Sequence, residues 1–354
     1  MGAVEGRGPS LADVAALAGV STQTVSRVSM GLDNVRPATR DRVLAAMAQL
    51  GYAPNSAARA LRYGSFRTIG MIAHRLARTG ESRTVEAVVE AARDQGYTVT
   101  LVDVESPSSD VVSAAATRLS HQAIDGLIIV RAEPATPDTL ALPLRLPVVV
   151  SDSRFVGHHP AVAADQADGA FRATQHLLDL GHRTVHHVAG PADSAPAQLR
   201  AEAWRATLAA AGRPVPEVVE GDWTAGSGYA AGRRLVADPE VTAVFCANDE
   251  MAAGVLRALH EAGRAVPRDV SVVGFDDILL AEYLWPPLTT VVQDFAEIGR
   301  RLVGRLLEQV RATTAPAAAR EAGGPGAGSD AEDLHEVVPV ELKIRASTAP
   351  PRQE

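Results

Sequence analysis

Residues 11–30, LADVAALAGVSTQTVSRVSM, decide the fold of the N-terminal part of the chain. Leu11 and Val14 begin an apolar repeat at helical spacing, which predicts a first short helix. Gly19 can supply the sharp turn that follows, because a residue without Cβ adopts a positive φ at little steric cost. Ser21 can then cap a second helix through its hydroxyl. The stretch is typical of a helix-turn-helix.

The second helix of this motif divides its side chains between two faces. Val25 and Val28 fall on one side, and the other side carries the polar residues Thr22, Gln23, Ser26 and Arg27. A narrow apolar stripe with donors and acceptors opposite suits a helix that reads base edges in the major groove. An ordinary helical hairpin with a solvated polar face has the same pattern, so the segments that follow must decide between the two.

A third helix and a short segment rich in Ala, Arg and Leu come next. Residues 36–55, RPATRDRVLAAMAQLGYAPN, place Pro37 in the first turn of this helix and Gly51 at its end. Residues 55–62, NSAARALR, are too few to form a stable helix in isolation. We therefore expect them to become ordered only against a second copy of the chain and DNA.

The order of these segments resembles the headpiece and hinge of the LacI family of repressors, and the resemblance, greatest to lac-type members, continues to about residue 346. It rests on the motif, the third helix, residues 51–55 (GYAPN) and residues 58–61 (ARAL). It implies DNA contacts by Leu11, Ser21, Thr22, Gln23, Ser26, Arg27, Asn34, Tyr52, Asn55, Ala58, Arg59 and Leu61. Leu61 matches a leucine that, in the family, wedges open the central base step from the minor groove. The expected partner is double-stranded operator DNA, with a homodimer reading two half-sites of an inverted repeat.

Charge is divided unevenly along the 354 residues. Residues 1–64 carry seven arginines and four acidic residues (+3), whereas the remainder carries 27 basic and 38 acidic residues (−11). A basic head on an acidic body suits a DNA-binding module joined to a domain that stays off DNA. The single cysteine, Cys246, excludes a disulfide framework. The chain has neither an apolar run long enough for a membrane span nor a signal-peptide core, so we expect a cytoplasmic protein with no membrane partner.

Beyond Phe66, short apolar strands alternate with amphipathic helices. The predicted strands are 68–73, 97–104, 126–130, 147–151, 184–189, 241–247, 270–275, 289–293 and 335–345. The predicted helices are 81–95, 166–180, 199–211, 249–262 and 295–311. Such alternation predicts α/β layers, with parallel sheets covered by helices on both faces. The alternating strands and helices are too many for one open sheet, so two lobes are expected.

The resemblance implies a two-lobed core like that of periplasmic binding proteins, with three chain crossings, which we place near Ala164, at Asp294 and before His335. The expected divisions are a small all-α headpiece (1–54), a hinge (55–65), a core (66–346), and a tail (347–354). Within the core, lobe 1 comprises about 66–164 and 294–312, lobe 2 about 165–293 and 334–346, and 313–333 form a flexible insertion. The tail lacks the leucine heptads of tetrameric family members, which predicts a dimer.

Polar residues that follow predicted strands indicate where an effector binds, because open α/β sheets bind ligands beyond the carboxyl ends of their strands. Hydroxyl groups of a saccharide need paired donors and acceptors, and its C–H faces pack on an aromatic ring. By resemblance, Arg200, Asn248 and Asp276 match ligand-gripping positions of the family. Its supporting positions are matched by Asp152, Trp223, Gln293 and Phe295.

Each of these residues also has a plainer interpretation. Asn248 can simply cap the following helix, Arg200 can lie on the surface, and Trp223 can pack between lobes. The set as a whole, all in loops at strand ends, favours a binding site. Pro196 and Ala164 depart from a serine and a phenylalanine in the family pattern, which predicts a reshaped pocket and argues against galactosides.

Other classes of function fit less well. His186 and His187 are neighbours on a strand and point to opposite faces, and no metal-ligand spacing occurs, so we expect no metal and no other cofactor. Motifs of nucleophilic catalysis and phosphate cradling are missing, which argues against an enzyme. A solute-binding receptor would need a signal peptide and no headpiece. A ligand-controlled transcriptional regulator remains. A glycoside is favoured over a sugar phosphate because the core has one lysine, Lys343, and over a purine because Ala164 stands where one of two facing aromatic rings would be needed.

Overall fold

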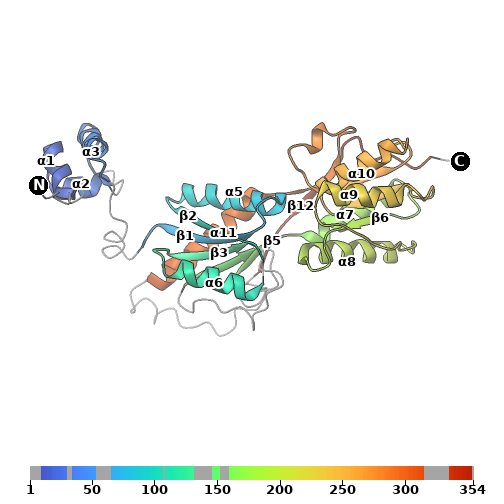
Figure 1. Ribbon diagram of the computed structural model, residues 1–354, viewed down its shortest axis with the longest axis horizontal. Helices are drawn as coiled ribbons and strands as arrows, with labels where there is room; N and C mark the ends of the chain where they lie inside the picture. The colour runs from blue at the N-terminus through green and yellow to red at the C-terminus, as the bar shows by residue number, and fades with distance from the viewer. Residues whose placement is uncertain are drawn as a thin grey trace, which may run out of the picture. The chain divides into compact units, whose positions relative to one another are not determined.

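The computed structural model describes residues 9–29, 34–52, 65–106, 108–130, 146–151, 159–314 and 335–352. The chain forms two compact units, Met1–Phe66 and Arg67–Glu354 (Figure 1).

The described part of the first unit contains three helices, α1 (Leu11–Ala18), α2 (Thr22–Ser29) and α3 (Pro37–Leu50). Ser10 and Asp13 form a capping box at the start of α1, and Gly19 ends that helix at a φ of 63°. The three helices share one small core, made of Val14, Ala15, Ala18, Val25, Val28, Val43, Ala46 and Met47. The turn and the apolar stripe of α2 therefore lie where the sequence predicts them.

The second unit is built on two six-stranded sheets, one in each lobe. In lobe 1 the strands are all parallel and lie in the order β11 (His335–Val338), β5 (Ala161–Ala164), β4 (Val148–Ser151), β3 (Gly126–Val130), β1 (Thr68–His74) and β2 (Thr98–Val104). In lobe 2 the order is β12 (Val340–Lys343), β10 (Thr289–Gln293), β9 (Ser271–Asp276), β8 (Ala243–Cys246), β6 (His186–Ala189) and β7 (Val219–Glu220). Only β12 is antiparallel to its neighbour in this sheet.

Helices cover both faces of each sheet (Figure 1). Lobe 1 has α5 (Thr79–Asp94) and α11 (Phe295–Thr314) on one face and α6 (Ser109–Ser120) on the other. Lobe 2 has α7 (Gln166–Asp179) and α8 (Ala195–Ala210) on one face and α9 (Ala225–Leu235) and α10 (Asp249–Glu261) on the other. Strand side chains alternate accordingly: Met71 packs towards α5 and α11, and its neighbour Ile72 packs towards α6.

The chain crosses between the lobes at Asp165, Asp294 and Pro339. Our sequence analysis placed the third crossing before His335, and that placement is wrong. The strand that begins at His335 pairs with β5 in lobe 1, and only β12, which follows Pro339, pairs with β10 in lobe 2. What looked like one strand is two, because proline has no N–H for the ladder and interrupts it.

Residues 347–349 belong to lobe 2 and are not part of a tail, which corrects a second boundary. Ser347 is fully buried, and its hydroxyl donates to the carbonyl of Val272 at 2.6 Å. The carbonyl of Ala349 accepts from Ser271 Oγ at 2.9 Å. The polar groups of this segment are thus paired with lobe 2. Of the predicted insertion, residues 315–333 lie outside the described residues.

Candidate functional site

A cavity of about 600 Å³ lies between the two lobes. Lobe 1 contributes residues 75–81, which follow β1, and Asp103 in β2. Lobe 2 contributes Arg200, Asp222, Trp223, Thr224, Asn248, Glu250 and Asp276. Most of these residues lie at or just beyond the carboxyl ends of parallel strands, where α/β sheets bind their ligands. The structure thus brings Arg200, Asn248, Asp276 and Trp223 into the wall of one cavity.

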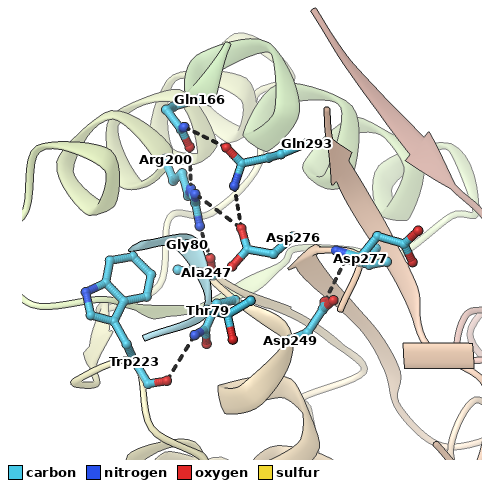
Figure 2. A network of polar contacts seen from close by, with 12 residues as sticks. Thr79, Gly80, Gln166, Arg200, Trp223, Ala247, Asp249, Asp276, Asp277 and Gln293 are labelled. Carbon is cyan, nitrogen blue, oxygen red and sulfur yellow. Dashed lines mark hydrogen bonds and ion pairs between the residues drawn. The ribbon is translucent and has the colours of Figure 1, made fainter. Parts of the chain in front are cut away.

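Arg200, on α8, is held in one orientation although it is almost fully buried (Figure 2). Its Nε donates to Gln166 Oε1 at 2.8 Å, and its Nη1 donates to the carbonyl of Ala247. Its Nη2 lies 3.6 Å from Asp276 Oδ1. The guanidinium also stacks on the ring of Phe275, 3.6 Å from the centroid. A guanidinium held by this many partners has a fixed orientation in the cavity wall.

Two buried glutamines connect this arginine to Asp276 through a chain of hydrogen bonds, and the ion pair between Arg200 and Asp276 closes the ring. Gln166 Nε2 donates to Gln293 Oε1 at 3.1 Å, and Gln293 Nε2 donates to Asp276 Oδ1 (Figure 2). Gln293 therefore does not line the cavity but fixes the carboxylate that does. Our sequence analysis included Gln293 and missed Gln166, whose place at the start of α7, immediately after a crossing, was its only signal.

The loop that carries Asp276 has an unusual backbone. Asp276 and Asp277 have φ values of 108° and 48°, in the region that side chains with Cβ disfavour. The buried carboxylate of Asp249 holds this loop, accepting from Ile278 N at 2.9 Å and from Thr290 Oγ1 at 2.6 Å. Burial raises the pKa of Asp249 well above its usual value. The strained conformation is thus determined by contacts from two neighbouring elements.

Asn248 caps a helix and also lines the cavity. Its Oδ1 accepts from Met251 N at 2.9 Å and caps α10, and its Nδ2 donates to the carbonyl of Trp223 at 2.9 Å. Trp223 is itself at a φ of 75°. Its indole lies against Gly190, where an added Cβ would be 2.3 Å from the ring. The cap and the close glycine contact together keep the tryptophan in the cavity wall.

The lobe 1 wall, residues 75–81 and Asp103, was not predicted from the sequence, where the lobe 1 candidates were Asp152 and Phe295. Thr79, the first residue of α5, donates from Oγ1 to Glu250 Oε1 in lobe 2. Arg83 Nη1 donates to the carbonyls of Asp276 at 3.4 Å and Asp277 at 3.2 Å. Two residues of one helix thus reach across to lobe 2. Ligands of open α/β sheets bind beyond the carboxyl ends of the strands, which we call the strand-end rule. Applied to the predicted strand 68–73, this rule would have indicated this wall.

The remaining predicted effector residues lie elsewhere. Phe295 supports Arg83, whose guanidinium lies 4.7 Å from its ring centroid, and it is not in the cavity wall. Pro196 and Ala164 line a separate hollow of about 240 Å³ and are not among the residues that line the cavity. Asp152 lies outside the described residues.

The predicted DNA-reading face is on the outer side of α2. Thr22 and Gln23 are exposed, and Ser26 and Arg27 are partly exposed. Ser21 Oγ accepts from Thr24 N at 3.2 Å and caps α2. Asn34, which precedes α3, is exposed. Leu11 and Tyr52 pack partly against the small core of this unit. The predicted contacts Asn55, Ala58, Arg59 and Leu61 lie outside the described residues.

The adjacent histidines of β6 do not form a joint site. His187 is fully buried between the rings of Trp204 and Phe245, with centroids 5.2 and 4.7 Å away, and burial lowers its pKa to about 4. His186 is only partly buried. Within the described parts of the chain, no group of three or more His, Cys, Asp or Glu residues is placed to hold a metal ion, and no helix is long and apolar enough to span a bilayer.

Comparison with known proteins agrees with both units. Residues 10–55 match the family described as bacterial regulatory proteins, lacI family, and residues 174–348 match the periplasmic binding protein-like domain. The ribose operon repressor of Escherichia coli K12 is 35% identical over 86% of this chain and 94% of its own. The lactose operon repressor of the same strain is 37% identical over 84% of each chain. The HTH-type transcriptional repressor PurR of Vibrio cholerae is 33% identical over 85% of this chain and 91% of its own.

Solved structures match over nearly the whole length. The lac repressor dimer bound to operator and the anti-inducer ONPF has a TM-score of 0.79 and 32% identity, covering 97% of this chain and 100% of its own. A complex of the transcriptional regulator CelR with cellobiose has a TM-score of 0.69 and 32% identity, covering 96% and 99%. The chain therefore belongs to the LacI family of bacterial regulatory proteins and is a DNA-binding repressor with a two-lobed, periplasmic-binding-protein-like core.

Proposed function

We propose that this chain acts as a dimer on an inverted-repeat operator, and that a neutral saccharide entering the cavity between the lobes changes its affinity for that operator. One observation carries the proposal: Arg200, Asn248 and Asp276 converge with Trp223 in a single cavity to which both lobes contribute. Relatives named for ribose and lactose operons, and a neighbour in complex with cellobiose, support a saccharide.

The site has the groups that a polyhydroxylated ligand needs. Asp276 accepts hydrogen bonds, Arg200 donates them, and both side chains are pre-oriented by their buried partners. The Trp223 indole provides an apolar surface for the C–H face of a sugar ring. Binding therefore depends on a few fixed polar groups, and little ordering of side chains opposes it.

Control of DNA binding would follow from contacts to both lobes. A ligand that touches both walls favours one relative arrangement of the lobes, because it interacts differently with each arrangement. Lobe 1 begins with β1 at Thr68, a few residues after the predicted hinge 55–65. We propose that the hinge senses this rearrangement and that the ligand releases the operator.

A sugar phosphate is the second candidate effector, and one residue favours it. Arg75 lines the cavity at a φ of 52°, is exposed, and makes no ion pair with any described residue. Our sequence argument against anionic ligands relied on the scarcity of lysine and overlooked this arginine. Against it stand the carboxylates of Asp103, Asp222 and Glu250 in the same wall, which would repel a phosphate.

Four large apolar side chains of lobe 2 favour a dimer. Leu279, Leu280, Tyr283 and Trp285 occupy one short segment around the 3-10 helix η1 (Ala281–Tyr283), and Trp285 is 93% exposed. A cluster of this kind is typical of a protein interface. We propose that the dimer contact lies there and on α5. We propose no catalytic activity, in keeping with relatives that are all named as repressors.

A thermal-shift screen of the full chain tests the effector class. The panel would contain ribose, lactose and cellobiose, ribose 5-phosphate, and the purine base adenine, with Arg200→Ala as the matched control. We expect a neutral saccharide to raise the melting temperature of the wild type and not of the variant. Stabilisation by ribose 5-phosphate alone would select the second candidate, and stabilisation of both proteins by the same sugar would place binding elsewhere.

A further inference from the structure

Two buried polar atoms of the cavity-lining residues have neither a hydrogen-bond partner nor an ion pair among the described residues. They are Glu250 Oε2, in the first turn of α10, and Trp223 Nε1, in the loop before α9. The Trp223 side chain is only 8% exposed. Buried polar atoms are nearly always paired in folded proteins, so two unpaired ones in one site need an explanation.

The other oxygen of Glu250 is already engaged from the opposite lobe. Thr79 Oγ1, at the start of α5, donates to Glu250 Oε1. This contact fixes the carboxylate from lobe 1 and leaves Oε2 buried without a hydrogen-bond partner. Asn248 lies two residues before Glu250, and its side chain donates to the carbonyl of Trp223. The backbone and this hydrogen bond therefore connect the residue that carries the unpaired acceptor, Glu250, to the residue that carries the unpaired donor, Trp223.

The two atoms are complementary in chemistry. A carboxylate oxygen only accepts hydrogen bonds, and an indole N–H only donates them. A hydroxyl group does both, so the neighbouring hydroxyls of a saccharide can satisfy both atoms. A phosphate or carboxylate group could accept from Trp223 but would be repelled by Glu250 and by Asp222 in the same wall.

We infer that Glu250 is a specificity-determining residue of the effector site. Its Oε2 accepts a hydrogen bond from one saccharide hydroxyl, Trp223 Nε1 donates to another, and Thr79 positions the carboxylate. This inference rests on the proposed saccharide effector and extends it to a residue outside the set carried over from the family resemblance. The ligand would then contact a side chain that belongs to lobe 2 and is hydrogen-bonded to lobe 1.

The test uses calorimetry on the full chain. Its probe is the saccharide among ribose, lactose and cellobiose that stabilises the wild type most. Glu250→Ala should weaken binding about tenfold to a hundredfold, because a hydrogen bond to a charged group is lost. Trp223→Phe, which keeps an aromatic ring but removes the N–H, should weaken it several-fold. The matched control is Glu240→Ala, which removes an exposed carboxylate of the same lobe and should bind as the wild type does.

Deoxy analogues of the probe identify the hydroxyl that Glu250 contacts. One deoxy analogue should bind the wild type about tenfold or more weakly, yet bind the Glu250→Ala variant as well as the parent sugar does. Thr79→Val, which replaces the hydroxyl by a methyl group of similar size, should weaken binding in the wild type and have no further effect in the Glu250→Ala background. This non-additivity separates positioning of Glu250 from a general loss of fold.

Each outcome is decisive. Wild-type affinity in Glu250→Ala, together with loss of binding in Arg200→Ala, would overturn the role of Glu250 and leave the proposed function standing. Binding that survives in both variants would contradict the cavity as the effector site. Failure of all three saccharides to bind the wild type would count against the saccharide proposal and this inference together. An amine-bearing sugar that binds at least tenfold more tightly than its hydroxyl parent would show that Glu250 selects a cation instead.

Discussion

Arg200 and Asp276 form an almost completely buried ion pair, with Nη2 3.6 Å from Oδ1 and side chains only 2% and 7% exposed. Breaking such a pair by removing one partner leaves the other charge buried and unpaired, which costs more than the pair itself contributes. The pair is therefore part of the fold of lobe 2 as well as of the candidate site. Tests of its role in binding must measure stability separately.

Substitution of either partner should abolish tight effector binding. We expect Asp276→Ala and Arg200→Ala each to weaken saccharide binding by roughly 2–4 kcal/mol, because a buried polar partner is left unpaired. Calorimetry gives the affinity, and urea unfolding of each apo variant gives the free energy of unfolding as the control. Asp276→Asn should lose less stability than Asp276→Ala, because its amide oxygen can still accept from Gln293. Retention of full affinity in both alanine variants would show that the site is misplaced.

Leu61→Ala tests the hinge. Leu61 is the one large apolar residue of a segment that is otherwise small or basic, and the family resemblance makes it the minor-groove wedge. We expect operator affinity in a gel-shift titration to fall several-fold or more, with effector affinity unchanged. Leu44→Ala is the control, because Leu44 is an exposed leucine of α3 in the same unit. An unchanged operator affinity in Leu61→Ala would refute the wedge role.

The exposed apolar segment of lobe 2 predicts the oligomeric state. Light scattering at micromolar concentration should give the mass of a dimer. Leu280→Asp should shift the equilibrium towards monomer, because the new charge would have to be buried in the contact. Val215→Asp, at an exposed apolar residue elsewhere in lobe 2, is the control and should remain dimeric. A tetramer, or a dimer unaffected by Leu280→Asp, would contradict this assignment.

His187 predicts how stability depends on pH. Burial lowers its pKa from 6.5 to about 4, so the folded state keeps a neutral ring where the unfolded chain takes up a proton. Its contribution is complete above pH 6.5 and is lost as the pH falls towards 4. Between pH 7 and pH 5 this amounts to about 2 kcal/mol.

His187→Phe should remove that part of the pH dependence, since a phenyl ring can still stack between Trp204 and Phe245. Urea unfolding of both proteins at pH 7 and pH 5 provides the comparison. Other partly buried histidines titrate equally in both proteins and cancel in the difference. Parallel stability curves for wild type and variant would exclude His187 as the source.

The local patterns of the sequence were sufficient for the headpiece and for most elements of the core. Gly19 ends α1 in the left-handed conformation that its lack of Cβ permits. Alternating residues of β1 pack against the helices on opposite faces of the sheet. These features depend on a few neighbouring residues. The third crossing was misplaced, because Pro339 indicates a break within residues 335–345 but does not tell which sheet the first half joins. Only the pairing of His335 with Ala161 decides it.

Half of the candidate site could be identified in the same way. Asn248 and Asp276 adjoin recognisable strands, so the strand-end rule finds them. Gln166 and Thr79 act through partners 127 and 171 residues away in the chain. Gln166 has no local signal beyond its place at a helix start, whereas Thr79 follows β1 closely enough for the strand-end rule to include it. Their roles depend on how the two lobes meet, which single-sequence patterns do not specify.

The most direct test of the central claim measures DNA binding and effector binding together. The full chain would select sequences from a random DNA library, and fluorescence anisotropy would then give its affinity for the enriched DNA with and without the stabilising saccharide. Our account predicts an inverted repeat of two half-sites, an affinity that falls at least tenfold with the saccharide, and no such change in Arg200→Ala. Enrichment without an inverted repeat, or a saccharide effect that persists in Arg200→Ala, would contradict it.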